Sequence, residues 1–269
     1  MATVTSTSPT VRVKSIALPP EHGAWGFLLE PVVAGLAIAP SWAGLLLSLG
    51  VLGAFLLRQP LKIVYQDRAH GRRYARTALA ERFAALYAAL ALAGLLGGLW
   101  LAGPRVLLPV PLAVPLAILL LGSYTRNRGR ELVPELAGAS ALAGTATAVA
   151  LAGGLAAGPA LALWAVLLGR DVPSILYVRA RLRLDKGKPV AWQPPIASHM
   201  LALALVTTLV VTGLAPALAM VALAVLLARA AYGLSPYRPC VRVAMLGVQE
   251  LGFGALTVLL VVAGYTWGA

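Results

Sequence analysis

Repeated apolar runs about 20 residues long constrain the fold of this chain more than any other feature. A run of that length, as an α-helix, crosses a hydrocarbon core roughly 30 Å thick and satisfies its own backbone hydrogen bonds. Short polar or Gly/Pro-rich stretches separate the runs. We expect helices at 23–39, 41–58, 83–102, 105–123, 132–154, 158–178, 197–214, 216–233 and 242–267. The sequence therefore predicts an all-α polytopic membrane protein with about nine transmembrane helices.

The composition supports a membrane protein. Only 12% of the 269 residues are charged and 60% are hydrophobic, whereas soluble domains carry about 25% charged residues. The net charge of +13 would suggest nucleic-acid binding in a soluble protein, but the positive-inside rule explains it here. The single cysteine, Cys240, excludes internal disulfides. We expect the lipid bilayer, and not nucleic acid, to be the partner of this surface.

The basic residues predict an orientation. Nearly all Lys and Arg residues fall before the first predicted helix or after the second, fourth, sixth and eighth, and Arg105 falls on the other side. This places the N-terminus in the cytoplasm and the C-terminus outside, in a bacterial inner membrane. The connections after the second and sixth helices are predicted to be long cytoplasmic loops. Residues 1–18 are predicted to be a disordered tail and 19–269 a single transmembrane domain.

Four ionisable residues lie inside the predicted spans: Glu30, Arg170, Asp171 and Glu250. Each costs about 2.5–3.5 kcal/mol on insertion scales, so each is a functional candidate. With a rise of about 1.5 Å per residue, Glu30, Arg170 and Glu250 lie in one layer, roughly 10–13 Å from the cytoplasmic helix ends. Arg170 and Asp171 are about 100° apart around a helix and are predicted not to face each other. We expect Arg170 to pair with Glu30 or Glu250.

Two interpretations of this charged layer remain open. The ions could simply pin the helices together, or they could line a ligand cavity. Pro31 and Pro173 lie beside them, and a proline inside a span frees backbone carbonyls, which is tolerated where helices line a cavity or pack on partners.

Basic side chains lie below this layer, at the cytoplasmic ends of two predicted helices. Arg58, Lys62 and Gln66 recur at helical spacing, and Tyr177 and Arg179 end the sixth helix. Guanidinium groups bind phosphate or carboxylate well, so these basic helix ends favour binding of an anionic amphiphile. The alternative is that the side chains extend along the lipid to place their charges among the headgroups. The predicted ligand-binding residues are Glu21, His22, Trp25, Glu30, Arg58, Lys62, Gln66, Arg170, Tyr177, Arg179 and Glu250.

Histidines give little indication of a metal site. His22, His70 and His199 fall at helix ends with irregular spacing, and no loop carries a ligand cluster. We expect no resident metal from these residues.

Two segments carry a family resemblance. The stretch "PPEHGAWGFLLEP", from Pro19 to Pro31, resembles the signature of the YwiC-like membrane protein family, and "YVRARLR", from Tyr177 to Arg183, is similar to a second segment of that family. The likeness extends over the whole chain, but the family name implies little about function.

The predicted plan also resembles the UbiA-type intramembrane prenyltransferases, which have nine spans and long inner loops after the second and sixth. Those enzymes hold a prenyl diphosphate through Mg²⁺ with two Asp-rich motifs. Aligned on Asp67, the chain has Arg76 and Thr77 where that family has Arg-Thr, and Asp171 matches a first Asp of the second motif. The resemblance makes Asp67 and Asp171 catalytic candidates.

The acidic motifs are incomplete. The chain has Ile63, Val64, Gly71, Ile175 and Arg179 at positions where the family has Asn or Asp. A diphosphate-bound divalent ion needs several oxygen ligands, so Mg²⁺ is only weakly supported and no other cofactor is expected.

The sequence therefore favours a membrane protein that binds an anionic amphiphile such as a prenyl diphosphate, as a divergent prenyltransferase or as a binding protein. One alternative is a small-anion or proton-coupled transporter with Glu30, Arg170, Asp171 and Glu250 as its relay. Another is a non-catalytic assembly partner of a membrane complex. The ligand, catalysis and the oligomeric state stay open.

Overall fold

The computed structural model of the chain describes residues 13–19, 22–71, 73–125 and 131–268. The described residues contain helices and no strands. The helices are α1 (Val13–Ala17), α2 (His22–Ile38), α3 (Trp42–Ala69), α4 (Ala75–Ala102), a 3₁₀ turn (Pro104–Leu107), α5 (Val110–Thr125), α6 (Leu132–Ala152), α7 (Ala157–Leu184), α8 (Gln193–Val211), α9 (Ala217–Leu234) and α10 (Val243–Trp267).

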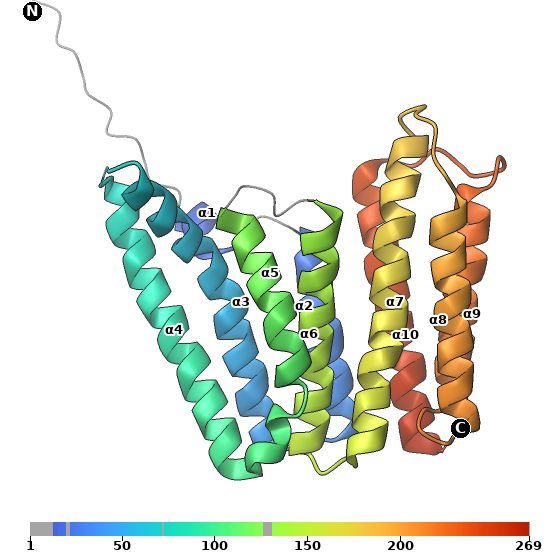
Figure 1. Cartoon of the computed structure of the whole chain (residues 1–269), viewed down its shortest axis with the longest axis horizontal. Coiled ribbons are helices and arrows are strands. Elements are labelled where there is room, and N and C mark those ends of the chain that lie inside the picture. Colours follow the sequence, from blue (N-terminus) through green and yellow to red (C-terminus); the bar gives the residue numbers. More distant parts are fainter. Residues whose placement is uncertain (1–12, 20–21, 72, 126–130, 269) are drawn as a thin grey trace, which may run out of the picture.

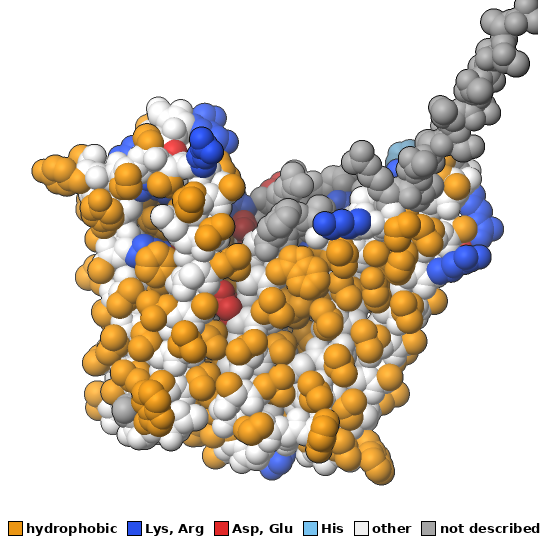
Figure 2. All heavy atoms as spheres, turned by 180° about the vertical axis from the view of Figure 1, so that it is seen from behind, with side chains coloured by type: hydrophobic (Ala, Val, Ile, Leu, Met, Phe, Trp, Pro, Cys, Tyr) orange, Lys and Arg blue, Asp and Glu red, His pale blue; other side chains and the backbone are white. Residues whose placement is uncertain are grey.

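The helices have the length and apolar surface of a polytopic membrane protein. Among the described residues, seven helices are long and apolar enough to cross a membrane, namely α3, α4 and α6 to α10, and α2 and α5 are shorter apolar helices. Hydrophobic side chains cover the face shown in Figure 2, whereas Lys and Arg gather along its upper edge. The all-α prediction is confirmed, and the count of nine spans is met only if both shorter helices also cross.

The helices form two groups that lie side by side in Figure 1. One group consists of α1 to α6 and the other of α7 to α10. The groups meet where α6 packs against α7 and where α2 packs against α10. The largest apolar core lies around α7 and includes Leu163, Leu167, Leu223 and Val261. The chain enters α2 at one end of the bundle, and α10 ends at the opposite end (Figure 1).

Glycines allow α3 and α4 to pack with their backbones almost in contact. A Cβ atom on Gly94 would lie 2.4 Å from the backbone nitrogen of Gly50, and one on Gly53 would lie 2.7 Å from that of Ala91. Small residues at a membrane helix interface permit this approach, and dispersion between the backbones then holds the pair together.

The prediction of two long cytoplasmic loops is wrong. Helix α3 continues through Pro60 to Ala69 and α4 begins at Ala75, so only residues 70–74 connect them. Helix α7 likewise continues to Leu184. Hydropathy predicts helix ends at the first charged residues, but helical hydrogen bonding does not stop at the edge of the hydrocarbon.

Part of the predicted tail is ordered. Residues 13–17 form α1, in which Ile16 and Ala17 are buried. Ile16 packs with Val64 and Ala80, and the Tyr87 hydroxyl donates to the Ala17 carbonyl at 3.2 Å. A buried apolar side chain in a Ser/Thr-rich segment offsets the entropy of ordering. Residues 1–12 lie outside the described residues.

Candidate functional site

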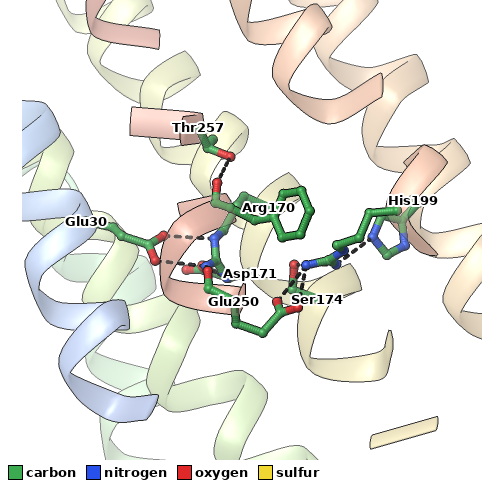
Figure 3. Close-up of polar contacts among 9 residues, drawn as sticks. Glu30, Arg170, Asp171, Ser174, His199, Glu250 and Thr257 are labelled. Atoms are coloured by element: carbon green, nitrogen blue, oxygen red, sulfur yellow. Dashed lines mark hydrogen bonds and ion pairs between the residues drawn. The ribbon is translucent and has the colours of Figure 1, made fainter. Parts of the chain in front are cut away.

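A buried ionic network lies where the two helix groups meet. We use this name for Glu30 on α2, Arg170 and Asp171 on α7, Arg229 on α9 and Glu250 on α10. Figure 3 shows the side chains of Glu30, Arg170, Asp171 and Glu250 pointing toward one another, with Ser174 and His199 nearby. Segments up to 220 residues apart in sequence supply the network, from position 30 to position 250.

Arg170 and Glu30 form the central pair, which confirms the predicted pairing. Nη2 of Arg170 donates to Oε1 of Glu30 at 2.9 Å, and Nε lies 2.8 Å from Oε2 as an ion-pair contact without a hydrogen bond. Nη2 also donates to the main-chain oxygen of Glu250 at 3.0 Å. Arg170 is 3% exposed and Glu30 is 8% exposed. Water therefore screens this pair very little, and removing one partner would leave a costly buried charge.

Asp171 shares the guanidinium of Arg170. Its Oδ1 lies 3.5 Å from Nη1 of Arg170, so the prediction that these sequence neighbours do not face each other is wrong. The long arginine side chain brings its guanidinium within reach of Asp171, which the angle between Cα positions does not capture. The separation exceeds an ordinary charge-assisted hydrogen bond, although Asp171 is only 2% exposed.

Arg229 is the member of the network that the sequence analysis missed as a site residue. Its Nη1 contacts both carboxylate oxygens of Glu250, at 2.7 and 2.6 Å, and its Nη2 donates to the Ser174 hydroxyl at 3.2 Å. The guanidinium carbon also lies 4.3 Å from the ring centroid of Tyr177 and 5.1 Å from that of Phe253. The basic-residue pattern assigns Arg229 to the residues that set orientation, but Arg229 lies inside the apolar run of the predicted helix 216–233. That position could have identified it as an intramembrane charge.

His199 contacts the network as a neutral side chain. Its Nδ1 lies 2.8 Å from the Pro195 carbonyl, which only accepts, so Nδ1 carries the hydrogen. Its Nε2 is then an acceptor and faces Nη2 of Arg229 at 3.5 Å. The part of the chain that the structure describes holds no group of three or more metal-ligating side chains.

Glycine on α10 makes room for the carboxylate of α2. A Cβ atom on Gly254 would lie 1.9 Å from Oε1 of Glu30 and 2.6 Å from Nη2 of Arg170. Any side chain at this position would displace the central pair. Helix α2 itself continues through Pro31, and α7 through Pro173, so both helices that supply the pair carry a proline beside it.

Asp67 lies in a separate cluster at the turn between α3 and α4. It accepts from Nη2 and Nε of Arg76 at 2.6 and 3.2 Å and from Oγ1 of Thr77 at 2.7 Å. Thus Arg76 and Thr77, which the UbiA-type comparison aligned, do contact this carboxylate. A pocket of about 400 Å³ opens beside Thr77 and is lined by Arg68, Gly71, Arg73, Thr77 and Glu81.

The remaining predicted residues are spread over other contacts. Arg179 pairs with Glu135 of α6 at 2.6 Å, half-exposed. Arg58 lies over the Phe55 ring at 5.2 Å, and Trp25 meets the edge of that ring at 5.2 Å. Lys62 and Gln66 are half-buried on α3. Glu21 and the side chain of His22 lie outside the described residues.

The predicted ligand residues thus divide among several groups of contacts. Glu30, Arg170 and Glu250 come together as expected, with Tyr177 against Arg229. Asp67 and Arg179 instead have their own ionic partners. The two catalytic candidates, Asp67 and Asp171, belong to different clusters, and no contact among the described residues joins them.

The comparisons with known proteins concern the first half of the chain. Residues 18–150 match the family model described as YwiC-like protein. No curated protein and no solved structure matches the chain. The matched segment contains Glu30 and the "PPEHGAWGFLLEP" stretch, whereas the other four residues of the network follow it. Residues 18–150 of the chain therefore belong to the YwiC-like family.

Proposed function

We propose that this protein is a proton-coupled transporter of a small anion, with the buried ionic network as its coupling site. The observation that carries the proposal is that two guanidinium groups and three carboxylates lie together among the apolar helices of the bundle. Intramembrane ionisable groups are costly and typically mark ion pathways or proton relays. We further propose that the protein resides in the bacterial cytoplasmic membrane with its N-terminus inside.

The position of the network supports coupling between the helix groups. Arg170 of α7 contacts Glu30 of α2, so the central ion pair spans the junction between the two groups. Because the attraction within the pair is between opposite charges, protonation of Glu30 would weaken it. A protonation event could therefore alter how the groups pack, as alternating access requires.

The two arginines offer a chemical route for an anion. Protonation of Glu250 would neutralise the partner of Arg229 and leave this guanidinium able to bind an anion instead. Proton and anion would enter together, and the total charge of the network would not change. Glu250 has the most exposed carboxylate of the network, with its side chain 15% exposed, so we expect exchange to begin there.

We propose that anions approach the network from the basic end of the bundle. Figure 2 shows a hollow between the two helix groups at the end where Lys and Arg gather, and acidic atoms are visible below it. Basic side chains at such an entrance raise the local concentration of anions.

Transport can be tested in proteoliposomes that contain a trapped pH dye. An inward gradient of chloride, sulfate or phosphate, each in turn, should drive an internal acidification that saturates with anion concentration. Glu250→Gln should abolish it, whereas Glu135→Gln, on a carboxylate outside the network, should retain it. The proposal fails if no anion moves protons, or if Glu250→Gln moves them at the wild-type rate.

A second candidate function is binding of an anionic amphiphile such as a prenyl diphosphate. The observation that favours it is the row of Arg58, Lys62 and Gln66, four residues apart on one face of α3 and half-buried. Saturable binding of a prenyl diphosphate to the purified protein, weakened by Lys62→Ala, would support it. If Asp67 and Asp171 were catalytic, Mg²⁺ would strengthen binding and Asp67→Asn would remove that gain.

A further inference from the structure

The buried ionic network contains one more carboxylate than guanidinium. Its acids are Glu30, Asp171 and Glu250, and its cations are Arg170 and Arg229. His199 contributes no charge, because its hydrogen bonds make it neutral. With every carboxylate ionised, the network would carry a net negative charge inside the membrane, where an uncompensated charge is very costly.

The helices packed against α7 supply no further cation. Helix α6 carries one ionisable residue, Glu135, which already pairs with Arg179, and α8 carries only His199. Helices α9 and α10 add only tyrosines to the groups named above, and α2 adds only His22, whose side chain lies outside the described residues. The other arginines of α7 are Arg179, Arg181 and Arg183, near the C-terminal end of the helix. Among the described residues, these helices leave the network one positive charge short, and a bound proton would supply it.

The three carboxylates are compensated unequally. Glu30 has two contacts with Arg170 at 2.8 and 2.9 Å, and Glu250 has two with Arg229 at 2.6 and 2.7 Å. Asp171 has one ionic contact, at 3.5 Å, with a guanidinium that already serves Glu30. Asp171 is therefore the carboxylate whose ionised form is stabilised least.

We propose that Asp171 carries a resident proton in the resting state and passes it to Glu30 during transport, whereas Glu250 exchanges the incoming proton. Its transport role rests on the proposed function, but the proton itself does not. Asp171 and Glu30 contact different nitrogens of the same guanidinium. Transfer of the proton from the Asp171 carboxyl to the Glu30 carboxylate would let Arg170 pair with Asp171 instead. One O–H bond breaks, one forms, and the charge of the network stays at zero.

Infrared spectroscopy tests this assignment on the purified full-length protein near neutral pH. A protonated carboxyl gives a C=O stretching band that shifts in D₂O. The wild type should show this band, Asp171→Asn should lose it, and the control Glu135→Gln should keep it. Absence of the band from the wild type, its persistence in Asp171→Asn, or its loss only in Glu30→Gln would overturn the proposal.

A labelling experiment avoids dependence on the folding of a variant. The chain has three aspartates, Asp67, Asp171 and Asp185, and the other two accept hydrogen bonds from Arg76 and Arg181. Incorporation of ¹³C-aspartate into the wild type should shift the protonated band to lower frequency. A band that does not shift belongs to a glutamate and overturns the proposal.

The outcomes for transport and for the proton are separable. A protonated aspartate in a protein that moves no anion would remove the proposed function and leave the assignment of Asp171 intact. Transport by a protein that lacks the band would support the proposed function and remove the assignment of a proton to Asp171.

Discussion

Arg170 and Glu250 are joined through the backbone of Glu250 and not through its carboxylate. Nη2 of Arg170 donates to the Glu250 main-chain oxygen at 3.0 Å, while the carboxylate of Glu250 reaches Arg229 on α9. One residue of α10 thus contacts both arginines of the network. Its carboxylate can change protonation or partner without breaking the contact between α10 and α7.

The central pair should show strong coupling in a double-mutant cycle. Glu30→Gln leaves Arg170 buried without its main counter-charge, and we expect a loss of about 3–5 kcal/mol in the free energy of unfolding. Arg170→Gln should cost a similar amount for the same reason. The double variant should lose less than the sum, because no unpaired ion remains. Unfolding in detergent measures all three, and additive losses would contradict the pairing.

Gly254 should not tolerate a methyl group. Gly254→Ala places its Cβ against the Glu30 carboxylate, so the central pair must move, and we expect a loss of about 1–3 kcal/mol. The control is Gly252→Ala on the same helix, where a Cβ would meet nothing within 4 Å. Equal unfolding temperatures for the two variants would show that Glu30 is not where the structure places it.

Arg229→Lys should destabilise the protein although it preserves the charge. A lysine cannot contact Glu250, donate to Ser174 and stack on Tyr177 at the same time. Loss of charge-assisted hydrogen bonds suggests about 1.5–3 kcal/mol. Arg82→Lys, at an exposed position on α4, is the control and should unfold like the wild type.

Asp67→Asn should affect stability without affecting transport. The amide can still accept from Thr77, but it loses the ion pair with Arg76, whose side chain is 53% exposed. We expect a loss of about 1–2 kcal/mol, because one partner stays hydrated. Proton-coupled flux should be unchanged. A collapse of flux with normal folding would mean that Asp67 and the network form one site after all.

The single cysteine tests the orientation. Cys240 is exposed in the connection between α9 and α10, which we place in the cytoplasm. A membrane-impermeant maleimide should label it only after the membrane is opened. In a Cys240→Ser background, Ala156→Cys, exposed in the connection between α6 and α7 at the other end of the bundle, should be labelled in intact cells. The reverse pattern would invert the proposed topology.

The class of fold follows from the order of amino acids alone. Apolar runs of membrane-spanning length require helices in lipid, because the bilayer offers no other partner for backbone N–H and C=O groups. The sequence also identified Glu30, Arg170 and Glu250 as a layer, since an ion in an apolar run is costly wherever it lies. Helix ends such as those at Ala69 and Ala75 were missed because hydropathy records the hydrocarbon boundary and not hydrogen bonding.

Which ions meet depends on how the helices pack against one another. Arg229 and Arg179 have similar chemistry, yet the first is buried against Glu250 and the second half-exposed against Glu135. The difference arises from the rotation and neighbours of α9 and α7, which one helix's sequence does not specify. Likewise, position 254 requires glycine only because the Glu30 side chain of α2 packs against it. Charge balance depends on distances across helices, and packing alone sets those distances.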